Sequence, residues 1–231
     1  MPSEKPILLT GAASGIGRAA AQALAAKAHA LALVDVNAEM LHEGVGICQR
    51  SSPRTRGFTC DVTDQAAVTR TWQQIRSEFG GVATLINCAG IGRFVPFLEI
   101  EPAEWLRMFQ VNVMGAVLFT RAVLPEMLAA GDGLIINVSS RMAVDPHANT
   151  TSYAASKGAL HAFSKALAME VKERGIKVTV LAPGGAKTNM ATPKHEGYLE
   201  PGAIADAIVY IAENSVSNVW VRDLVVLPLG F

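Results

Sequence analysis

Short runs of apolar residues recur along the chain and predict its strands. Each of the clearest runs is five or six residues long and rich in Leu, Ile and Val. Continuous apolar runs of this length are typical of strands that are buried on both faces of a parallel sheet. The predicted strands cover 6–10, 30–35, 83–88, 134–139, 177–182 and 224–229, with a weaker strand at 54–60.

Helix-like stretches lie between these strands, and several open with an Asp, Thr or Pro that favours a first helical turn. The alternation predicts an α/β fold, a doubly wound parallel sheet of about seven strands with helices on both faces. No repeat or Pro/Gly-rich linker marks a second domain, so residues 1–231 are expected to form a single domain. The predicted helices cover 15–28, 38–50, 64–79, 102–130, 152–174 and 201–214.

Composition narrows the possible functions. With 50% hydrophobic and 17% charged residues, the chain is expected to bury a large core. Its 20 Lys and Arg balance 20 Asp and Glu without a run of like charge, which argues against binding to nucleic acid or to a membrane. The start MPSEKPILLT does not resemble a secretion signal, so we expect a cytoplasmic protein. Cys48, Cys60 and Cys88 are widely separated and indicate neither disulfides nor a metal site.

A glycine-rich turn follows the first predicted strand. Gly11, Gly15 and Gly17 stand in TGAASGIGRAAAQALA, directly before an Ala-rich helix. Bare backbone N–H groups at a helix N-terminus are what a pyrophosphate needs. The spacing GxxxGxG departs from the GxGxxG dinucleotide fingerprint, and an ordinary tight turn between a strand and a helix is the alternative.

Asp35 ends the second predicted strand, about twenty residues after this turn. A carboxylate at that place can bind both hydroxyls of an adenosine ribose and repel a 2′-phosphate, which favours NAD over NADP as cofactor. The alternative is that Asp35 only caps the helix that begins near Asn37. Arg18 could attract a phosphate, but one arginine does not outweigh the neighbouring carboxylate, so NADP is the lesser possibility.

Tyr153 and Lys157 lie four residues apart in YAASK, and a helix places them on one face. A phenol with an ordinary pKa of about 10 is a poor base. An ammonium about 4 Å away, at an effective dielectric of about 20, contributes on the order of 4 kcal/mol and predicts a tyrosine pKa of roughly 7. Tyr153 could then exchange a proton with a substrate oxygen held by Ser139 or Ser140 at a strand end. The alternative is a packed tyrosine beside a solvated lysine.

Taken together, the motifs resemble those of one family. They run TGAASGIG, LVD, DVTD, NCAG, VN at Val111 and Asn112, NVSS, YAASK and APGGAKT. In this order and spacing they are similar to the short-chain dehydrogenase/reductases, over nearly the whole chain from about Ile7 to Val226. The resemblance implies a Rossmann-type fold and an oxidoreductase that moves a hydride between nicotinamide and a secondary alcohol or ketone.

The resemblance also implies roles for residues at matching positions. Ser140 is chosen as the catalytic serine because it lies thirteen residues before Tyr153. It steadies the reacting oxygen, Tyr153 is the acid and base, Lys157 binds the nicotinamide ribose, and the backbone of Asn112 helps to hold a water. The expected cofactor-binding residues are Gly11, Ser14, Gly15, Ile16, Gly17, Asp35, Asp61, Val62, Asn87, Ala89, Gly90, Tyr153, Lys157, Pro183, Gly184 and Thr188.

Segments that border the substrate pocket in similar proteins supply candidates for specificity. Arg141 or Arg93 could pair with a substrate carboxylate, although such an arginine more often lies on the surface or pairs with a local acid. His147 is expected to be exposed and not catalytic. The short segment TNMATPKHEGYLE leads from Thr188 to Pro201, which predicts a poorly covered cleft. A bulky substrate, a partner or neighbouring subunit, and loose specificity all remain open. The candidates are Arg93, Phe94, Phe97, Arg141, His147, Asn149 and Met190.

The predicted helices 102–130 and 152–174 hold more apolar and small residues than burial on one side requires. In similar enzymes this surface forms a dimer seam, so we expect a homodimer or homotetramer; a second buried face within one subunit is the alternative. The expected partner is a small alcohol or carbonyl compound.

Two other functions stay open. One is a redox-sensing binding protein that responds to cofactor occupancy. The other is a 3-oxoacyl-thioester reductase, which Asp35 disfavours because such relatives usually use NADPH.

Overall fold

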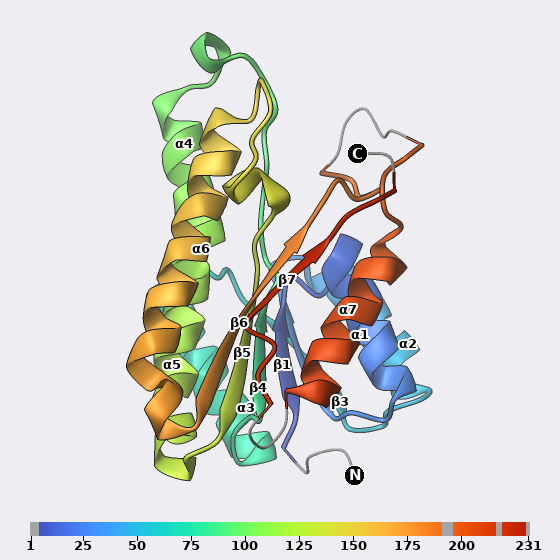
Figure 1. Cartoon of the computed structure of the whole chain (residues 1–231). Helices are drawn as coiled ribbons and strands as arrows, with labels where there is room; N and C mark the ends of the chain where they lie inside the picture. Colours follow the sequence, from blue (N-terminus) through green and yellow to red (C-terminus); the bar gives the residue numbers. More distant parts are fainter. Residues whose placement is uncertain (1–4, 191–195, 216–218, 230–231) are drawn as a thin grey trace.

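The computed structural model describes residues 5–190, 196–215 and 219–229. Within these residues seven strands form one parallel sheet in the order β3-β2-β1-β4-β5-β6-β7 (Figure 1). This confirms the predicted doubly wound parallel sheet, including its weakest predicted strand. The strands are β1 (Ile7–Thr10), β2 (Leu31–Asp35), β3 (Thr55–Thr59), β4 (Thr84–Asn87), β5 (Gly133–Val138), β6 (Ile176–Pro183) and β7 (Asp223–Val226).

Helices cover both faces of the sheet. In Figure 1, α1, α2 and α7 lie on one side of it and α4, α5 and α6 on the other. The helices are α1 (Gly15–Ala26), α2 (Ala38–Gln49), α3 (Gln65–Phe79), α4 (Pro102–Phe109), α5 (Gly115–Ala130), α6 (Thr151–Val171) and α7 (Pro201–Asn214). Shorter helical turns are η1 (Phe97–Glu99), η2 (Gln110–Met114), η3 (Arg141–Ala143) and η4 (Lys172–Arg174).

Two hydrophobic cores hold these layers together. Successive side chains of a strand point to opposite faces, so Leu8 packs in the core with α3, α5 and α6, whereas Leu9 packs in the core with α1, α2 and α7. Both leucines are fully buried. Burial on both faces explains why the strands are continuous apolar runs and do not alternate with polar residues.

The predicted helix 102–130 is interrupted. A wide π-helical turn, η2, separates α4 from α5. The side chain of Asn112, inside this turn, bonds to the backbone of Ile91 and so ties the turn to the segment after β4. Such turns are rare and occur mostly at functional sites. Sequence periodicity cannot reveal this turn, because it depends on a contact between distant segments.

Residues Pro102–Ala130 are also long and apolar enough, by length and composition, to cross a membrane, with a mean hydropathy of 1.5 over their most apolar window. Phe119, Val123 and Met127 of this stretch are fully buried against the sheet. Its inner face is therefore a core face of the domain.

The sheet order reverses between β1 and β4, which are neighbours although two strands separate them in sequence. Thr10 and Asn87, the last residues of these strands, are register partners. In open α/β sheets the crevice outside such a reversal is where ligands bind. The glycine-rich turn after Thr10 and the NCAG segment that begins at Asn87 therefore meet at the expected place.

Candidate active site

A cavity of about 640 Å³ lies at the carboxyl ends of the strands. It is continuous from the glycine-rich turn to the segment that contains Tyr153. Its volume lies within the usual range for cofactor and substrate sites. The predicted residues that line it are Gly11, Ser14, Gly15, Ile16, Gly17, Asp35, Asp61, Val62, Ala89, Gly90, Phe94, Ser140, Arg141, His147, Asn149, Tyr153, Lys157, Pro183, Gly184, Thr188 and Met190.

The glycine-rich turn has room only for glycine at its critical positions. Gly11 has a φ of +70°, and a Cβ there would lie 2.7 Å from the Cα of Ala89. A Cβ on Gly17 would overlap the carbonyl oxygen of Gly11. Ser14 precedes α1, and its side chain makes no capping hydrogen bond. The first N–H groups of α1 thus lack an acceptor within the helix, which fits a pyrophosphate at this end of the cavity.

Asp35 is held in place by two backbone donors. Its Oδ2 accepts a hydrogen bond from the N–H of Ala13 at 2.9 Å, and its Oδ1 accepts one from the N–H of Asn37 at 2.9 Å. The cap of α2 is Asn37, whose side chain accepts from the N–H of Met40. Asp35 is therefore not the helix cap, and its carboxylate lines the cavity. This geometry fits the ribose of an adenine nucleotide.

Arg18, the possible phosphate partner, has a different partner in the structure. Its two terminal nitrogens reach both carboxylate oxygens of Glu43, at 2.6 and 3.3 Å. Such a bidentate pair fixes the guanidinium in one direction. Arg18 is not among the residues that line the main cavity.

Asp61 and Cys88, which also line the cavity, have shifted pKa values. The backbone N–H of Thr63 bonds to Asp61 and, with the Thr63 hydroxyl and nearby Arg107, holds the pKa of that carboxyl below its usual range. Asp61 therefore carries its negative charge at neutral pH. Burial raises the pKa of the Cys88 thiol to about 11, so Cys88 is a neutral thiol on the cavity wall.

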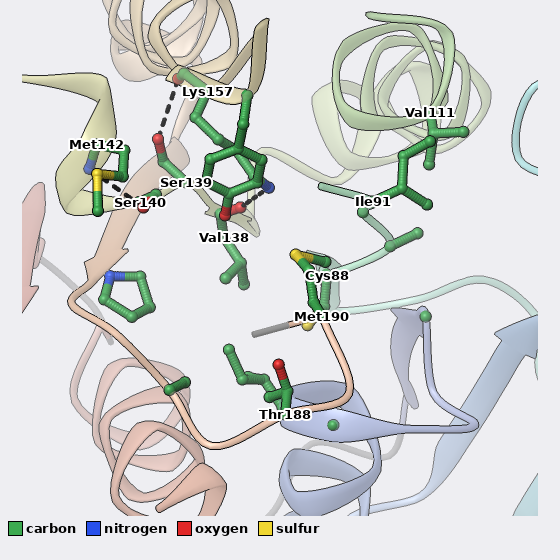
Figure 2. Close-up of a pocket in the computed structure, with 18 of the residues that line it drawn as sticks. Cys88, Ile91, Val111, Val138, Ser139, Ser140, Met142, Lys157, Thr188 and Met190 are labelled. Atoms are coloured by element: carbon green, nitrogen blue, oxygen red, sulfur yellow. Dashed lines mark hydrogen bonds between the residues drawn. The ribbon is translucent and has the colours of Figure 1, made fainter. Parts of the chain in front are cut away.

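Ser140, Tyr153 and Lys157 come together at the other end of the cavity. Ser140 follows β5, while Tyr153 and Lys157 lie on one face of α6. The ammonium of Lys157 is buried and donates to the carbonyl oxygen of Val138 at 2.8 Å (Figure 2). It lies 5.9 Å from the centre of the Tyr153 ring. Ser140 lies near enough to the Tyr153 hydroxyl to lower the pKa of the phenol.

The neighbouring serine has another task. Ser139 Oγ donates to the carbonyl oxygen of Lys157 at 3.1 Å, which ties β5 to α6 behind the site. Ser140 Oγ instead accepts from the N–H of Met142 at 3.2 Å and lines the cavity. Both serines line the cavity, and the one thirteen residues before Tyr153 is the one that acts on the pKa of that tyrosine.

The pKa of Tyr153 shifts in the direction opposite to the sequence-based expectation. Burial raises it to about 12, although the nearby Ser140 side chain opposes this rise. The predicted value of roughly 7 is wrong for this state of the site, because burial removes water from the phenol and this effect outweighs the others. Burial also lowers the pKa of Lys157 to about 8.

Asn112 lies behind the cavity wall and is 1% exposed. Its Oδ1 accepts from the N–H of Ile91 at 2.8 Å, and its Nδ2 donates to the Ile91 carbonyl oxygen at 2.9 Å. Nδ2 also lies 2.9 Å from Ser156 Oγ, which in turn donates to the Tyr153 carbonyl oxygen. The side chain therefore positions the wall segment at Ile91 and the helix that carries Tyr153.

The substrate end of the cavity is walled by apolar side chains. Phe94 stands edge-on to the Tyr153 ring, with ring centres 5.3 Å apart. Met190 lies close to Gly92, where a Cβ would come within 3.1 Å of its sulfur. Figure 2 shows Met190 and Thr188 across the cavity from Ser140, Met142 and Lys157. His147 is exposed, as expected, and contributes to the rim of the cavity.

Tyr198 is a lining residue that the sequence analysis missed. Its ring packs over Gly185, where a Cβ would lie 2.5 Å from the ring. Hydrogen bonds of 2.8 Å from Lys187 N to the Leu199 carbonyl oxygen and from Leu199 N to the Gly185 carbonyl oxygen fix this segment. The sequence feature that could have indicated this contact is the second glycine of APGGAKT, Gly185, because it leaves room for the ring. Residues 191–195 of the predicted short lid lie outside the described residues.

Besides Asn112, three predicted site residues are not among those that line the cavity. The side chain of Arg93 pairs with that of Glu104 at 2.8 Å. Arg93 therefore matches the alternative interpretation, in which the arginine lies on the surface and pairs with a local acid. Phe97 is 62% exposed and packs edge-on against Trp105. Asn87 is buried, and its Nδ2 donates to Asn137 on the adjacent strand at 2.8 Å.

Comparison with known proteins identifies the family of the chain. The family model for the short chain dehydrogenases matches residues 5–199. The chain belongs to the short-chain dehydrogenase family. It is accordingly an oxidoreductase, as the sequence resemblance implied.

Individual relatives span nearly the whole chain. D-threitol dehydrogenase of Mycolicibacterium smegmatis is 34% identical and aligns with 96% of this chain and 91% of that protein. The alcohol dehydrogenase of Thermococcus sibiricus, solved with 5-hydroxy-NADP, is 26% identical with a TM-score of 0.90, and 97% of each chain is covered. The 3-ketoacyl-(acyl-carrier-protein) reductase of Brucella melitensis, solved with NADH, is 30% identical with a TM-score of 0.88, and 96% of each chain is covered.

Proposed function

We propose that this protein is an NAD(H)-dependent dehydrogenase or reductase that interconverts a secondary alcohol and a ketone. One observation carries the proposal. A single cavity has a glycine-rich helix N-terminus and Asp35 at one end and the Ser140, Tyr153 and Lys157 side chains at the other. A dinucleotide that spans the cavity would bring its nicotinamide to the hydroxyl groups.

The side chains divide the chemistry. When bound, nicotinamide supplies the carbon that gives or takes the hydride. Ser140 holds the substrate oxygen by a hydrogen bond, and Tyr153 exchanges a proton with that oxygen. The raised pKa of Tyr153 keeps its proton in place, so the site as described is ready to donate to a ketone oxygen. Lys157 is anchored by the Val138 carbonyl oxygen and keeps a positive charge near the Tyr153 phenol. This charge favours the deprotonated form of Tyr153, which takes the proton when an alcohol is oxidised.

Two groups support NAD over NADP. The Asp35 carboxylate lines the nucleotide end of the cavity and would repel a 2′-phosphate. Arg18, which could attract that phosphate, is paired with Glu43. The solved relatives include one with an NADP derivative and one with NADH, so the fold itself accepts either cofactor and the choice depends on these local groups.

We also propose that the enzyme is a cytoplasmic homodimer or homotetramer that associates through the helices over 102–130 and 152–174. Large apolar side chains stand exposed there: Leu106 is 66% exposed, Met114 45% and Met169 59%. A second copy would remove this apolar surface from water. Sedimentation of the purified protein tests the assembly, and a Met169→Glu variant should weaken it.

The reaction is tested by following nicotinamide absorbance with secondary alcohols and ketones, using NAD(H) and NADP(H) in parallel. The panel includes a 3-oxoacyl thioester, since the Brucella melitensis reductase was solved with NADH and NAD(H) use alone does not exclude such a substrate. Tyr153→Phe should lower kcat by roughly 10²- to 10⁴-fold while NADH still binds. Equal turnover by the parent and the variant would overturn the proposal. Tight NADH binding without turnover would favour a redox sensor.

A further inference from the structure

We propose that the substrate carries a carboxylate group and that Arg141 recognises it. This inference rests on the proposed function, because it names the class of alcohol or ketone that the same site accepts. The expected substrates are hydroxy acids and oxo acids in which a small apolar body separates the carboxylate from the reacting carbon.

Arg141 lies beside the catalytic groups. It directly follows Ser140 and begins η3, and it lines the cavity. Its side chain is 15% exposed, which is little for an arginine. A buried guanidinium is costly unless its N–H groups have partners. A cation at the edge of a reaction site attracts a ligand of opposite charge.

Local partners hold Arg141 but do not use all its donors. Nη1 lies 3.2 Å from Oδ2 of Asp145, and Nη2 contacts Nε2 of His147. Asp145 is 66% exposed and is not among the lining residues. A guanidinium has five N–H donors in a rigid fork. These two contacts orient the fork and leave donors for a carboxylate, which arginine binds in a planar, bidentate manner.

The remaining surroundings favour an anion at the substrate end. Among the described residues, the acidic groups that line the cavity are Asp35 and Asp61, both at the nucleotide end. The substrate walls include Phe94, Met142 and Met190, which offer no compensating charge. An ion pair in such an apolar enclosure is less screened than one on the surface. Arg141 is therefore well placed to select a carboxylate over a neutral group of the same shape.

Cyclohexanecarboxylate and its neutral counterpart, cyclohexanecarboxamide, test the site without needing a reaction. Each is titrated calorimetrically into the full-length protein, with and without NADH. The parent should bind the acid at least tenfold more tightly than the amide. Arg141→Met should reduce this preference to less than threefold, and Arg141→Lys should retain part of it because the charge stays. Arg76→Met is the matched control: Arg76 is 65% exposed, pairs with Glu126 and does not line the cavity.

The inference would be overturned if the parent showed no preference for the acid. It would also be overturned if the preference survived in Arg141→Met or disappeared in Arg76→Met. A second experiment distinguishes failure of the carboxylate site from failure of the proposed function. It measures turnover of 4-hydroxycyclohexanecarboxylate and of 4-methylcyclohexanol with NAD. If the acid binds through Arg141 but no panel compound is turned over, the proposed function fails and the carboxylate site stands. If neutral alcohols react as well as acids in both parent and Arg141→Met, the function stands and the carboxylate site fails.

Discussion

The two ends of the cavity are built in different ways. The nucleotide end is formed largely by backbone, with Gly11, Ser14 and Gly17 within one seven-residue segment. The substrate end is formed by side chains from four separate segments, namely Phe94, Arg141, Met190 and Tyr198. Backbone contacts of the first kind tolerate only glycine and so leave a readable motif. Side chains on loops can change without disturbing the sheet, so we expect the substrate end to carry the individual specificity of the enzyme.

The largest effect is expected where the backbone is closest. Gly17→Ala places a Cβ against the Gly11 carbonyl oxygen, so the turn must open. We expect the free energy of unfolding to fall by roughly 3 kcal/mol and NADH binding to be lost. Urea unfolding and fluorescence titration measure both. Gly46→Ala in α2, where nothing lies within 4 Å, should instead stabilise by about 0.5–1 kcal/mol. Equal behaviour of the two variants would show that the turn is not sterically critical.

The next effect concerns the choice of cofactor. Asp35→Ala removes the carboxylate that opposes a 2′-phosphate but also removes its bonds to Ala13 and Asn37. We expect the ratio of kcat/KM for NAD to that for NADP to fall at least tenfold, which is about 1.4 kcal/mol. Asp35→Asn, which keeps hydrogen-bonding capacity without the charge, is the control for loop geometry. A ratio unchanged in both variants would mean that Asp35 does not select the cofactor.

A smaller effect links the catalytic end to pH. Burial lowers the pKa of Lys157 to about 8, so by pH 9 the folded state has lost most of this proton while the unfolded state keeps it. The free energy of unfolding should therefore rise by about 1 kcal/mol between pH 8 and 9, relative to that of Lys157→Met. Urea unfolding at pH 7.5, 8.0, 8.5 and 9.0 checks this. If the free energy of unfolding changed with pH in the same way for the parent and for Lys157→Met, the lowered pKa of Lys157 would be contradicted.

The smallest effect separates two arginines that the sequence could not distinguish. Arg93 pairs with Glu104 outside the cavity, whereas Arg141 lines it. Arg93→Gln should change the KM of every reacting substrate by less than twofold, because the Arg93 side chain pairs with Glu104 and does not line the cavity. Steady-state kinetics with one acid and one neutral alcohol measure this. A selective loss for the acid in this variant would move the recognition site to Arg93.

Much of the fold was predictable because its signals are local. Apolar runs and the intervening helical stretches placed all seven strands within two or three residues, with β7 ending three residues early at Val226. The break at η2 was not predictable, because the bonds between Asn112 and Ile91 join segments 21 residues apart. Tyr198 was missed for the same reason, since its ring reaches the cavity only because Gly185 leaves room for it.

The sequence by itself determined the order of strands and helices, the glycine positions and the spacing between Ser140, Tyr153 and Lys157. These follow from steric limits and helical or strand periodicity, which act over short distances along the chain. Only the tertiary structure decided which arginine reaches the cavity, which groups restrain Arg18 and Asp35, and in which direction the pKa of Tyr153 moves. Those properties depend on burial and on through-space partners, and both are set by how distant segments pack together.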